Sequence, residues 1–207
     1  MNIHIEPSKL EKLILYILKS LDRSVGSVEL AKLIYLIDIE SFRLTGATIT
    51  NQKYYRAPLG PIVSDFEVAR SWLDGFEINV SEEQTPSPRG TKKHSITLGP
   101  KPRFSSDFSS VEEAIISKAL SRYSKKSVSE LKRIAYDTEP WKIIQDYETT
   151  NKKYFRGELD LSSLKRNLIY SDWLSKKDSA IKKDKEYEEF LSNERNEVKE
   201  LLSSLST

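Results

Sequence analysis

The sequence predicts a mainly α-helical protein of the α+β class, with a compact helical domain, a small antiparallel β element and a long charged C-terminal helix. Apolar residues recur at spacings of three and four in several segments, as on one face of an α-helix. Ser-x-x-Glu sequences, which often form capping boxes, precede these segments. Two short segments alternate apolar and polar residues, which is typical of half-buried strands.

The first two helices lie in the N-terminal quarter of the chain. Ser8 and Glu11 form a predicted capping box, and apolar residues then recur as far as Leu21. A second helix is predicted from Val28 to Leu44. It is apolar on most sides, which indicates a central, buried position. Gly46 follows as the left-handed residue that commonly ends a helix.

A proline-rich turn is expected to begin the third helix. Residues 48–58 are rich in Thr, Ile and Tyr and favour an extended backbone. Pro58-Leu59-Gly60-Pro61 then predicts a rigid turn, because two prolines fix φ on either side of a glycine. The third helix is predicted from Ile62 to Asp74, with Gly75 as its stop signal.

Two strands and two more helices are predicted next. Phe76–Val80 and His94–Leu98 alternate as an antiparallel pair would, and residues 81–93 are expected to form a mobile loop between them. Each helix is expected to start at a capping box. Ser110 with Glu113 precedes the helix Val111–Tyr123, and Ser127 with Glu130 precedes the helix Val128–Tyr136. Pro140 is expected to end the second of them.

The C-terminal part is highly charged. Helices are predicted over Ser163–Leu174 and Ser179–Leu205, and the second has only a sparse apolar stripe. We therefore divide the chain into a domain at 1–150 and a charged helical extension at 151–207, which packs on the domain or on a partner.

Composition narrows the classes of function. The chain has 207 residues, 33 basic and 31 acidic, so no excess of positive charge favours nucleic acid. It has no cysteine, and its two histidines have no acidic residue at ligand spacing, so we expect neither metal nor other cofactor. No catalytic set stands out, which favours a binding protein over an enzyme. With no apolar segment long enough for a membrane, a cytoplasmic location is expected.

Several residues have both a structural and a functional interpretation. Asp38 lies within an apolar helix, so it needs a Lys, an Arg or a Tyr hydroxyl of the next segment as partner, or else belongs to a polar seam used in recognition. The rigid turn holds Tyr54, Tyr55 and Arg56, and exposed Tyr and Arg are enriched at binding hot spots. Trp141 is interpreted as a core anchor, with an exposed contact as the alternative.

The motifs, taken in order, resemble the Panacea domain of the SocA-like antitoxin family. The resemblance spans Ser27 to Ile144 and is carried by Lys32, Leu33, Tyr35, Asp38, Gly46, Tyr54, Pro58–Pro61, Pro140 and Trp141. It implies an antitoxin of a bacterial or phage-borne toxin–antitoxin system, whose partner is a protein toxin encoded nearby. One member of the family acts as a proteolytic adaptor, so the resemblance also allows delivery of the toxin to a protease.

We accordingly predict that the chain neutralises its toxin by direct binding. The residues predicted to bind the partner are Tyr54, Tyr55, Arg56, Pro58, Gly60, Pro61, Tyr187, Phe190 and Leu191. The alternatives are the proteolytic adaptor and a DNA-binding autorepressor that uses the first two helices. Whether the chain forms homo-oligomers is left open.

Overall fold

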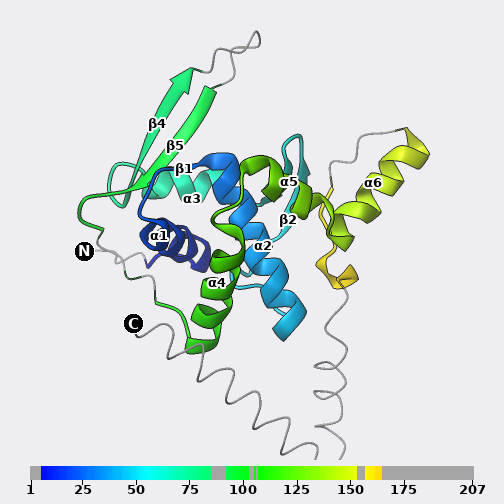
Figure 1. Ribbon diagram of the computed structural model, residues 1–207, viewed down its shortest axis with the longest axis horizontal. Helices are drawn as coiled ribbons and strands as arrows, with labels where there is room; N and C mark the ends of the chain where they lie inside the picture. Colours follow the sequence, from blue (N-terminus) through cyan, green and yellow to red (C-terminus); the bar gives the residue numbers. More distant parts are fainter. Residues whose placement is uncertain (1–5, 85–91, 103–104, 106, 153–156, 165–207) are drawn as a thin grey trace, which may run out of the picture.

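The computed structural model describes residues 6–84, 92–102, 105, 107–152 and 157–164. Helices predominate in these residues, and a small antiparallel sheet and a separate hairpin accompany them, which confirms the predicted α+β class. Figure 1 shows α2 in the middle of the molecule, with α1 and α4 on one side and α6 on the other. The predicted helix Ser179–Leu205 and nearly all of the one predicted at Ser163–Leu174 lie outside the described residues.

The first two helices form as predicted. α1 (Lys9–Leu21) begins with the Ser8–Glu11 capping box, in which the Glu11 amide donates to Ser8 Oγ and the Ser8 amide donates to the Glu11 carboxylate. α2 (Ser27–Thr45) ends at Gly46, whose φ is +80°. Every residue from Leu30 to Ile39 is buried, so α2 is the central helix of the core.

The proline-rich turn differs from its prediction. β2 (Tyr54–Ala57) and β3 (Gly60–Val63) form an antiparallel hairpin, with Tyr54 opposite Val63 and Ala57 opposite Gly60. The loop is therefore only Pro58 and Leu59, and Ile62 lies in a strand rather than at a helix start. The prediction was wrong because both sides of the turn pair with each other, which leaves α3 (Phe66–Leu73) to begin after the hairpin.

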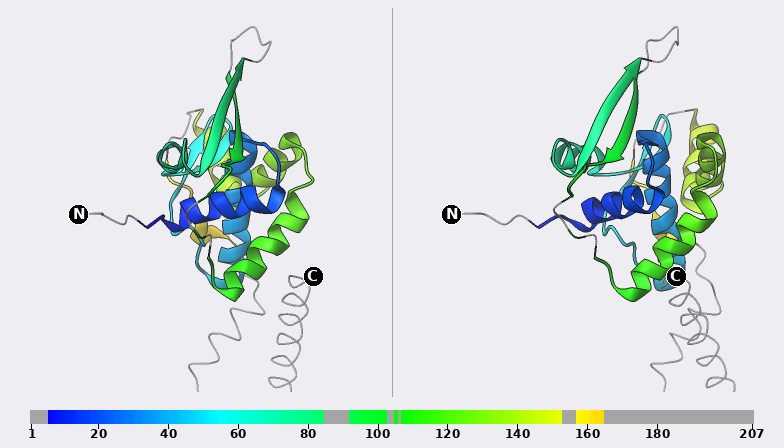
Figure 2. Two further views of the ribbon diagram at one scale, coloured as in Figure 1. Left: turned by 90° about the vertical axis from the view of Figure 1, so that its left-hand side faces the viewer. Right: turned by 60° about the vertical axis from the view of Figure 1, so that its left-hand side comes forward.

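A second β element projects from the helical body. β4 (Ile78–Gln84) pairs with β5 (Lys92–Leu98), and β5 also pairs with the short β1 (Val25–Gly26), in the order β1-β5-β4. Figures 1 and 2 show the β4–β5 hairpin extending away from the helices. The strands extend into the predicted loop at both ends, because backbone pairing continues from Ser81 opposite Ser95 to Gln84 opposite Lys92. The first strand also starts later than predicted, since the exposed Phe76 lies outside it.

The last helices show two further differences. α4 (Ser110–Tyr123) is capped by Ser109 with Glu112, one residue before the predicted pair, because adjacent Ser and Glu residues let the earlier pair form the same box. α5 (Val128–Tyr136) has the predicted Ser127–Glu130 box. Pro140 does not end a helix. It lies in the first turn of α6 (Glu139–Asn151), where a missing backbone N–H removes no helical hydrogen bond.

Residues 157–164 return to the β2–β3 hairpin. The Arg56 amide donates to the Gly157 carbonyl at 3.1 Å, and the Leu159 amide donates to the Tyr54 carbonyl at 2.8 Å. Leu159 is buried, and so is Leu164, which follows the 3-10 turn η1 (Leu161–Ser163). This part of the predicted extension therefore packs on the domain.

Candidate functional site

Two polar residues on α2, Asp38 and Lys32, contact the β2–β3 hairpin or the segment before it. Asp38 accepts hydrogen bonds from the Ile49 amide at 2.7 Å, the Thr50 amide at 3.2 Å and the Tyr54 hydroxyl at 2.7 Å, and from the Thr50 hydroxyl. Burial raises the pKa of Asp38, and these hydrogen bonds counter part of that effect. The structural interpretation of Asp38, with a Tyr hydroxyl among its partners, is confirmed.

Lys32, on the same helix as Asp38, makes a second buried polar contact. Its Nζ donates to the Pro61 carbonyl at 2.7 Å, and the residue is only 2 % exposed. Burial lowers the pKa of this lysine to about 7, and the positive charge of Lys132 contributes to the same shift. Lys32 therefore links α2 to β3. Its surroundings make protonation of the amine less favourable than in water.

Gly60 is required by the close packing around Lys32. It adopts φ +104°, and a Cβ at this position would lie 2.6 Å from Tyr136 Cε1 and 2.8 Å from Lys32 Cε. Both distances are below normal van der Waals separation, so no other residue fits without displacing its neighbours. The glycine of the Pro-Leu-Gly-Pro sequence thus allows α2, α5 and the hairpin to meet.

Tyr35 joins α2 to the start of α6. Thr138 Oγ1 donates to the Ala135 carbonyl, so the Tyr35 hydroxyl donates to Thr138 Oγ1, at 2.7 Å. The Tyr35 ring also meets the Tyr54 ring edge-on, with centroids 5.1 Å apart. Thr138 precedes Glu139 and Pro140, so this contact positions the first turn of α6.

Arg56 is the centre of a stacked cluster rather than an exposed contact. Its guanidinium lies 4.7 Å from the centroid of the Trp141 ring, whose other neighbour is the Tyr136 ring, stacked at 4.6 Å. Two hydrogen bonds of 3.1 Å join Arg56 to the Glu148 carboxylate. The cluster fastens the hairpin to α6 and confirms Trp141 as a buried anchor.

The predicted partner-binding residues have different surroundings. Tyr54 is only 1 % exposed, and Gly60 and Pro61 are buried, so the expectation that this part of the turn offers surface contacts is wrong. These residues face α2, which the sequence did not reveal. Tyr55 and Pro58 are exposed. Leu59, which lies between Pro58 and Gly60, is 53 % exposed. Tyr187, Phe190 and Leu191 lie outside the described residues.

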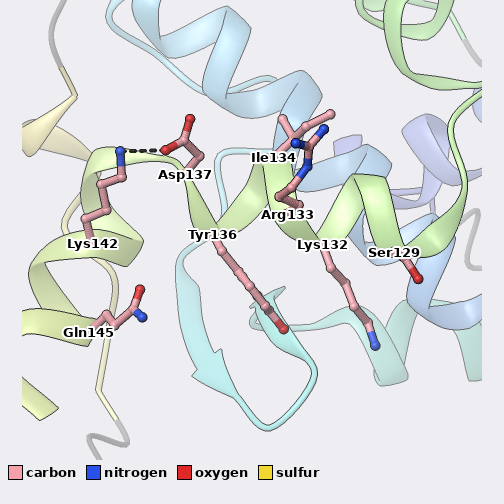
Figure 3. A pocket seen from close by; sticks show the side chains of 8 residues that line it. All are labelled: Ser129, Lys132, Arg133, Ile134, Tyr136, Asp137, Lys142 and Gln145. Carbon is pink, nitrogen blue, oxygen red and sulfur yellow. Dashed lines mark ion pairs between the residues drawn. The ribbon is translucent and has the colours of Figure 1, made fainter. Parts of the chain in front are cut away.

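A hollow of about 860 Å³ lies between α5 and α6, and Figure 3 shows its lining. Its charged lining is mainly basic, and the lining residues are Ser129, Lys132, Arg133, Ile134, Tyr136, Asp137, Lys142 and Gln145. Asp137 forms an ion pair of 2.6 Å with Lys142. Sequence reasoning missed this site because it missed α6, although Thr138, Glu139 and Pro140 are together a start signal for a helix.

Two kinds of site are absent from the part of the chain that the structure describes. It contains no group of His, Cys, Asp and Glu side chains that could hold a metal ion. Among the described helices, none combines the length and the apolar character that crossing a bilayer demands.

Comparison with known proteins identifies the family. The family model for the SocA-like antitoxin, Panacea domain, matches residues 30–142, which is more than half of the chain. No curated protein and no solved structure matches. The matched region contains every motif residue from Lys32 to Trp141. It includes the hairpin, Asp38 with its partners, Arg56 with Tyr136 and Trp141, and most of the α5–α6 hollow. The chain belongs to the SocA-like antitoxin family, of which residues 30–142 are the Panacea domain.

Proposed function

We propose that the chain is an antitoxin that neutralises a cognate protein toxin, encoded nearby, by direct contact. The match to the antitoxin family over residues 30–142 carries this proposal. The family supports an antitoxin role in general, and direct contact is our extension of it. Exposed apolar side chains on the hairpin and α6, which the Arg56 contacts join, support direct contact with a protein.

The surface we assign to this contact is the tip of the β2–β3 hairpin together with the outer face of α6. Leu59 at the tip is 53 % exposed, and Ile143 on α6 is 55 % exposed. The Arg56–Trp141–Glu148 cluster fixes these two elements relative to each other. Exposed apolar side chains on a preorganised surface lose little entropy when a partner covers them. The contact surface is therefore held ready before binding.

The described structure gives no support to the alternative in which α1 and α2 read DNA. A recognition helix must present side chains to the bases of the major groove. All residues from Leu30 to Ile39 of α2 are buried among α1, α4, α5 and the hairpin. The exposed surface outside α2 is better suited to binding a protein than to reading DNA.

Co-expression tests the proposed function. The tagged chain is produced together with the protein of the adjacent open reading frame, and growth and co-purification are both scored. We expect restored growth and a stoichiometric complex. If the neighbour is toxic and the chain neither rescues growth nor co-purifies, the proposal is wrong. Rescue without a complex, dependent on a cellular protease, would favour the adaptor alternative.

Matched surface variants test the assigned contact. Leu59→Ser removes an exposed apolar side chain at the hairpin tip, and Val111→Ser removes one that is 57 % exposed in the first turn of α4, apart from the hairpin in Figure 1. We expect Leu59→Ser to weaken the complex by roughly 10-fold or more, as for a hot-spot residue. Val111→Ser should bind as the unmodified chain does, and equal behaviour of both variants would contradict the assignment.

A truncation tests the predicted contribution of Tyr187, Phe190 and Leu191. The cut belongs after Leu164, because Leu159 and Leu164 are buried against the domain and an earlier cut would disturb folding. We propose that the residues after Leu164 complete the contact, so the truncated chain should bind the toxin more weakly. Unchanged neutralisation would exclude this role for the tail.

A further inference from the structure

The α5–α6 hollow is lined by more basic than acidic side chains. Lys132, Arg133 and Lys142 line it, and Asp137 is its one acidic lining residue. Asp137 is already joined to Lys142 by the 2.6 Å ion pair. Among the residues that the structure describes, neither Lys132 nor Arg133 has a carboxylate at ion-pair distance. Two basic side chains therefore remain for an external anion.

The charge of Lys132 also extends toward the hairpin. Figure 3 shows the Lys132 and Tyr136 side chains pointing in the same direction, toward the ribbon of the hairpin. The positive charge of Lys132 adds to the effect of burial in lowering the pKa of Lys32. A carboxylate placed beside Lys132 would relieve this repulsion, so the site is electrostatically suited to an acidic ligand.

The hollow also offers apolar surface. Ile134 and the Tyr136 ring contribute to its lining, and Tyr136 is held in place by its stacking on Trp141. Ser129 and Gln145 add neutral hydrogen-bonding groups. A volume of about 860 Å³ is large enough for several side chains of a peptide segment. This mixture fits an acidic residue that is flanked by apolar ones.

We propose that the α5–α6 hollow receives an acidic segment of the protein partner, with one partner carboxylate bound by Lys132 and another by Arg133, whose side chains point in different directions in Figure 3. The inference rests on the proposed function, since the partner is the toxin. It adds the chemistry of the toxin segment and a second contact region beside the hairpin tip. Charge complementarity of this kind mainly sets specificity and the rate of association.

A protein segment suits the hollow better than a nucleic acid does. Binding along a phosphate backbone requires a row of basic side chains, and its affinity grows with their number. Of the basic residues that line the hollow, only Lys132 and Arg133 have no ion pair with a described residue, and two such residues do not make a row along a phosphate backbone. The nearby exposed apolar residue Ile143 also favours a protein surface.

The test compares two double variants that lose the same charge. Lys132→Gln/Arg133→Gln removes the two basic groups of the hollow, and Lys19→Gln/Lys118→Gln removes two exposed lysines of α1 and α4. Affinity for the purified toxin is measured by calorimetry at several salt concentrations. We expect the hollow variant to lose affinity by on the order of 10- to 100-fold and to show a shallower salt dependence.

The outcomes separate this inference from the function on which it rests. If the toxin binds the unmodified chain and both double variants equally well, the hollow is not the contact and the proposed function still stands. If the toxin does not bind the unmodified chain, both proposals are wrong. If toxin binding is unchanged but the hollow variant alone loses binding to a mixed-sequence single-stranded RNA, the hollow is a nucleic-acid site instead.

Discussion

Asp38 and Lys32 are two buried ionisable residues on the same helix, and their surroundings differ sharply. The Asp38 carboxylate accepts hydrogen bonds from two backbone amides and two hydroxyls. Lys32 donates to the Pro61 carbonyl and lies near another positive charge, that of Lys132. Four hydrogen bonds counter the burial of the Asp38 charge, whereas the Lys32 charge has one carbonyl acceptor and a positive neighbour.

This difference separates two uses of a buried polar side chain. Asp38 fixes the backbone of Ile49 and Thr50, and it orients Tyr54 at the start of the hairpin. Lys32 satisfies one carbonyl and fills space beneath Gly60, but its charge is a cost to folding. We therefore expect removal of Asp38 to be damaging and removal of the Lys32 charge to be tolerated.

The largest effect is expected for Asp38→Ala. It leaves the Ile49 and Thr50 amides and the Tyr54 hydroxyl buried without their acceptor, which should lower the free energy of unfolding by roughly 3–5 kcal/mol. Urea unfolding followed by circular dichroism measures it. Glu40→Ala, on the same helix, is the control; it removes an ion pair with Arg122 and a hydrogen bond from the Tyr123 hydroxyl and should cost roughly 1–2 kcal/mol. Equal losses in the two variants would contradict the role given to Asp38.

Gly60→Ala tests the space beside Lys32. The new methyl group would meet Tyr136 and Lys32 below van der Waals distance, and φ is +104°, so we expect a loss of roughly 2–4 kcal/mol. Gly75→Ala is a matched control, because its φ is +79° and no atom lies within 4 Å of the added Cβ. It should lose only about 1 kcal/mol. The difference between the two variants measures the steric contact together with the greater backbone strain at φ +104°.

The Lys32 amine should make stability depend on pH. Its pKa is about 7 in the folded protein against an ordinary value of 10.5, so between these values the unfolded chain binds a proton that the folded chain does not. Stability therefore rises with pH across this window, and the full cost of the buried charge is present below pH 7. From pH 7 to pH 9 the gain should be roughly 2 kcal/mol.

Lys32→Met isolates this effect from the other titrating groups. The variant keeps the volume of the side chain and removes its charge, so the difference in stability between it and the unmodified chain should shrink as pH rises from 7 to 9. Thermal unfolding across this pH range measures the difference. A difference that does not change with pH would show that Lys32 stays charged in the folded protein up to pH 9, which would contradict the lowered pKa.

The smallest effect is expected for Tyr54→Phe, which removes one of the hydroxyl donors to Asp38. A hydrogen bond to a buried carboxylate typically contributes more than a neutral one, so a loss of about 1–2 kcal/mol is expected. Tyr16→Phe, which removes a hydroxyl contact of 3.2 Å with Ser117, should cost less. If Tyr54→Phe were the cheaper of the two, the remaining donors would be sufficient for Asp38.

Local signals in the sequence predicted much of the helical framework. The Ser8 and Ser127 capping boxes, the apolar surface of α2 and the Gly46 stop all depend on neighbouring residues, and the structure confirms them. The β2–β3 hairpin escaped prediction because its strands are only four residues long, too short for clear alternation. α6 was missed because Pro140 was interpreted as an end signal rather than a first-turn residue.

The candidate site was less predictable than the fold. The Asp38–Tyr54 contact spans 16 residues and was among the partners expected from the sequence. Arg56 meets Trp141 and a carboxylate 92 residues away, and only the packing of α6 on the hairpin brings these groups together. The basic hollow likewise depends on the angle between α5 and α6, which no local pattern records.

The pairing of residues 157–159 with β2 has a consequence for avidity. Because Leu159 donates to Tyr54 and Leu164 is buried, the chain that follows is tethered within a few residues of the hairpin. If the toxin binds at the hairpin as proposed, a contact between it and residues after Leu164 would be intramolecular, with an effective concentration set by the connecting chain. Two individually weak contacts would then act as one strong one, and cutting the chain after Leu164 would remove that gain without altering the hairpin itself.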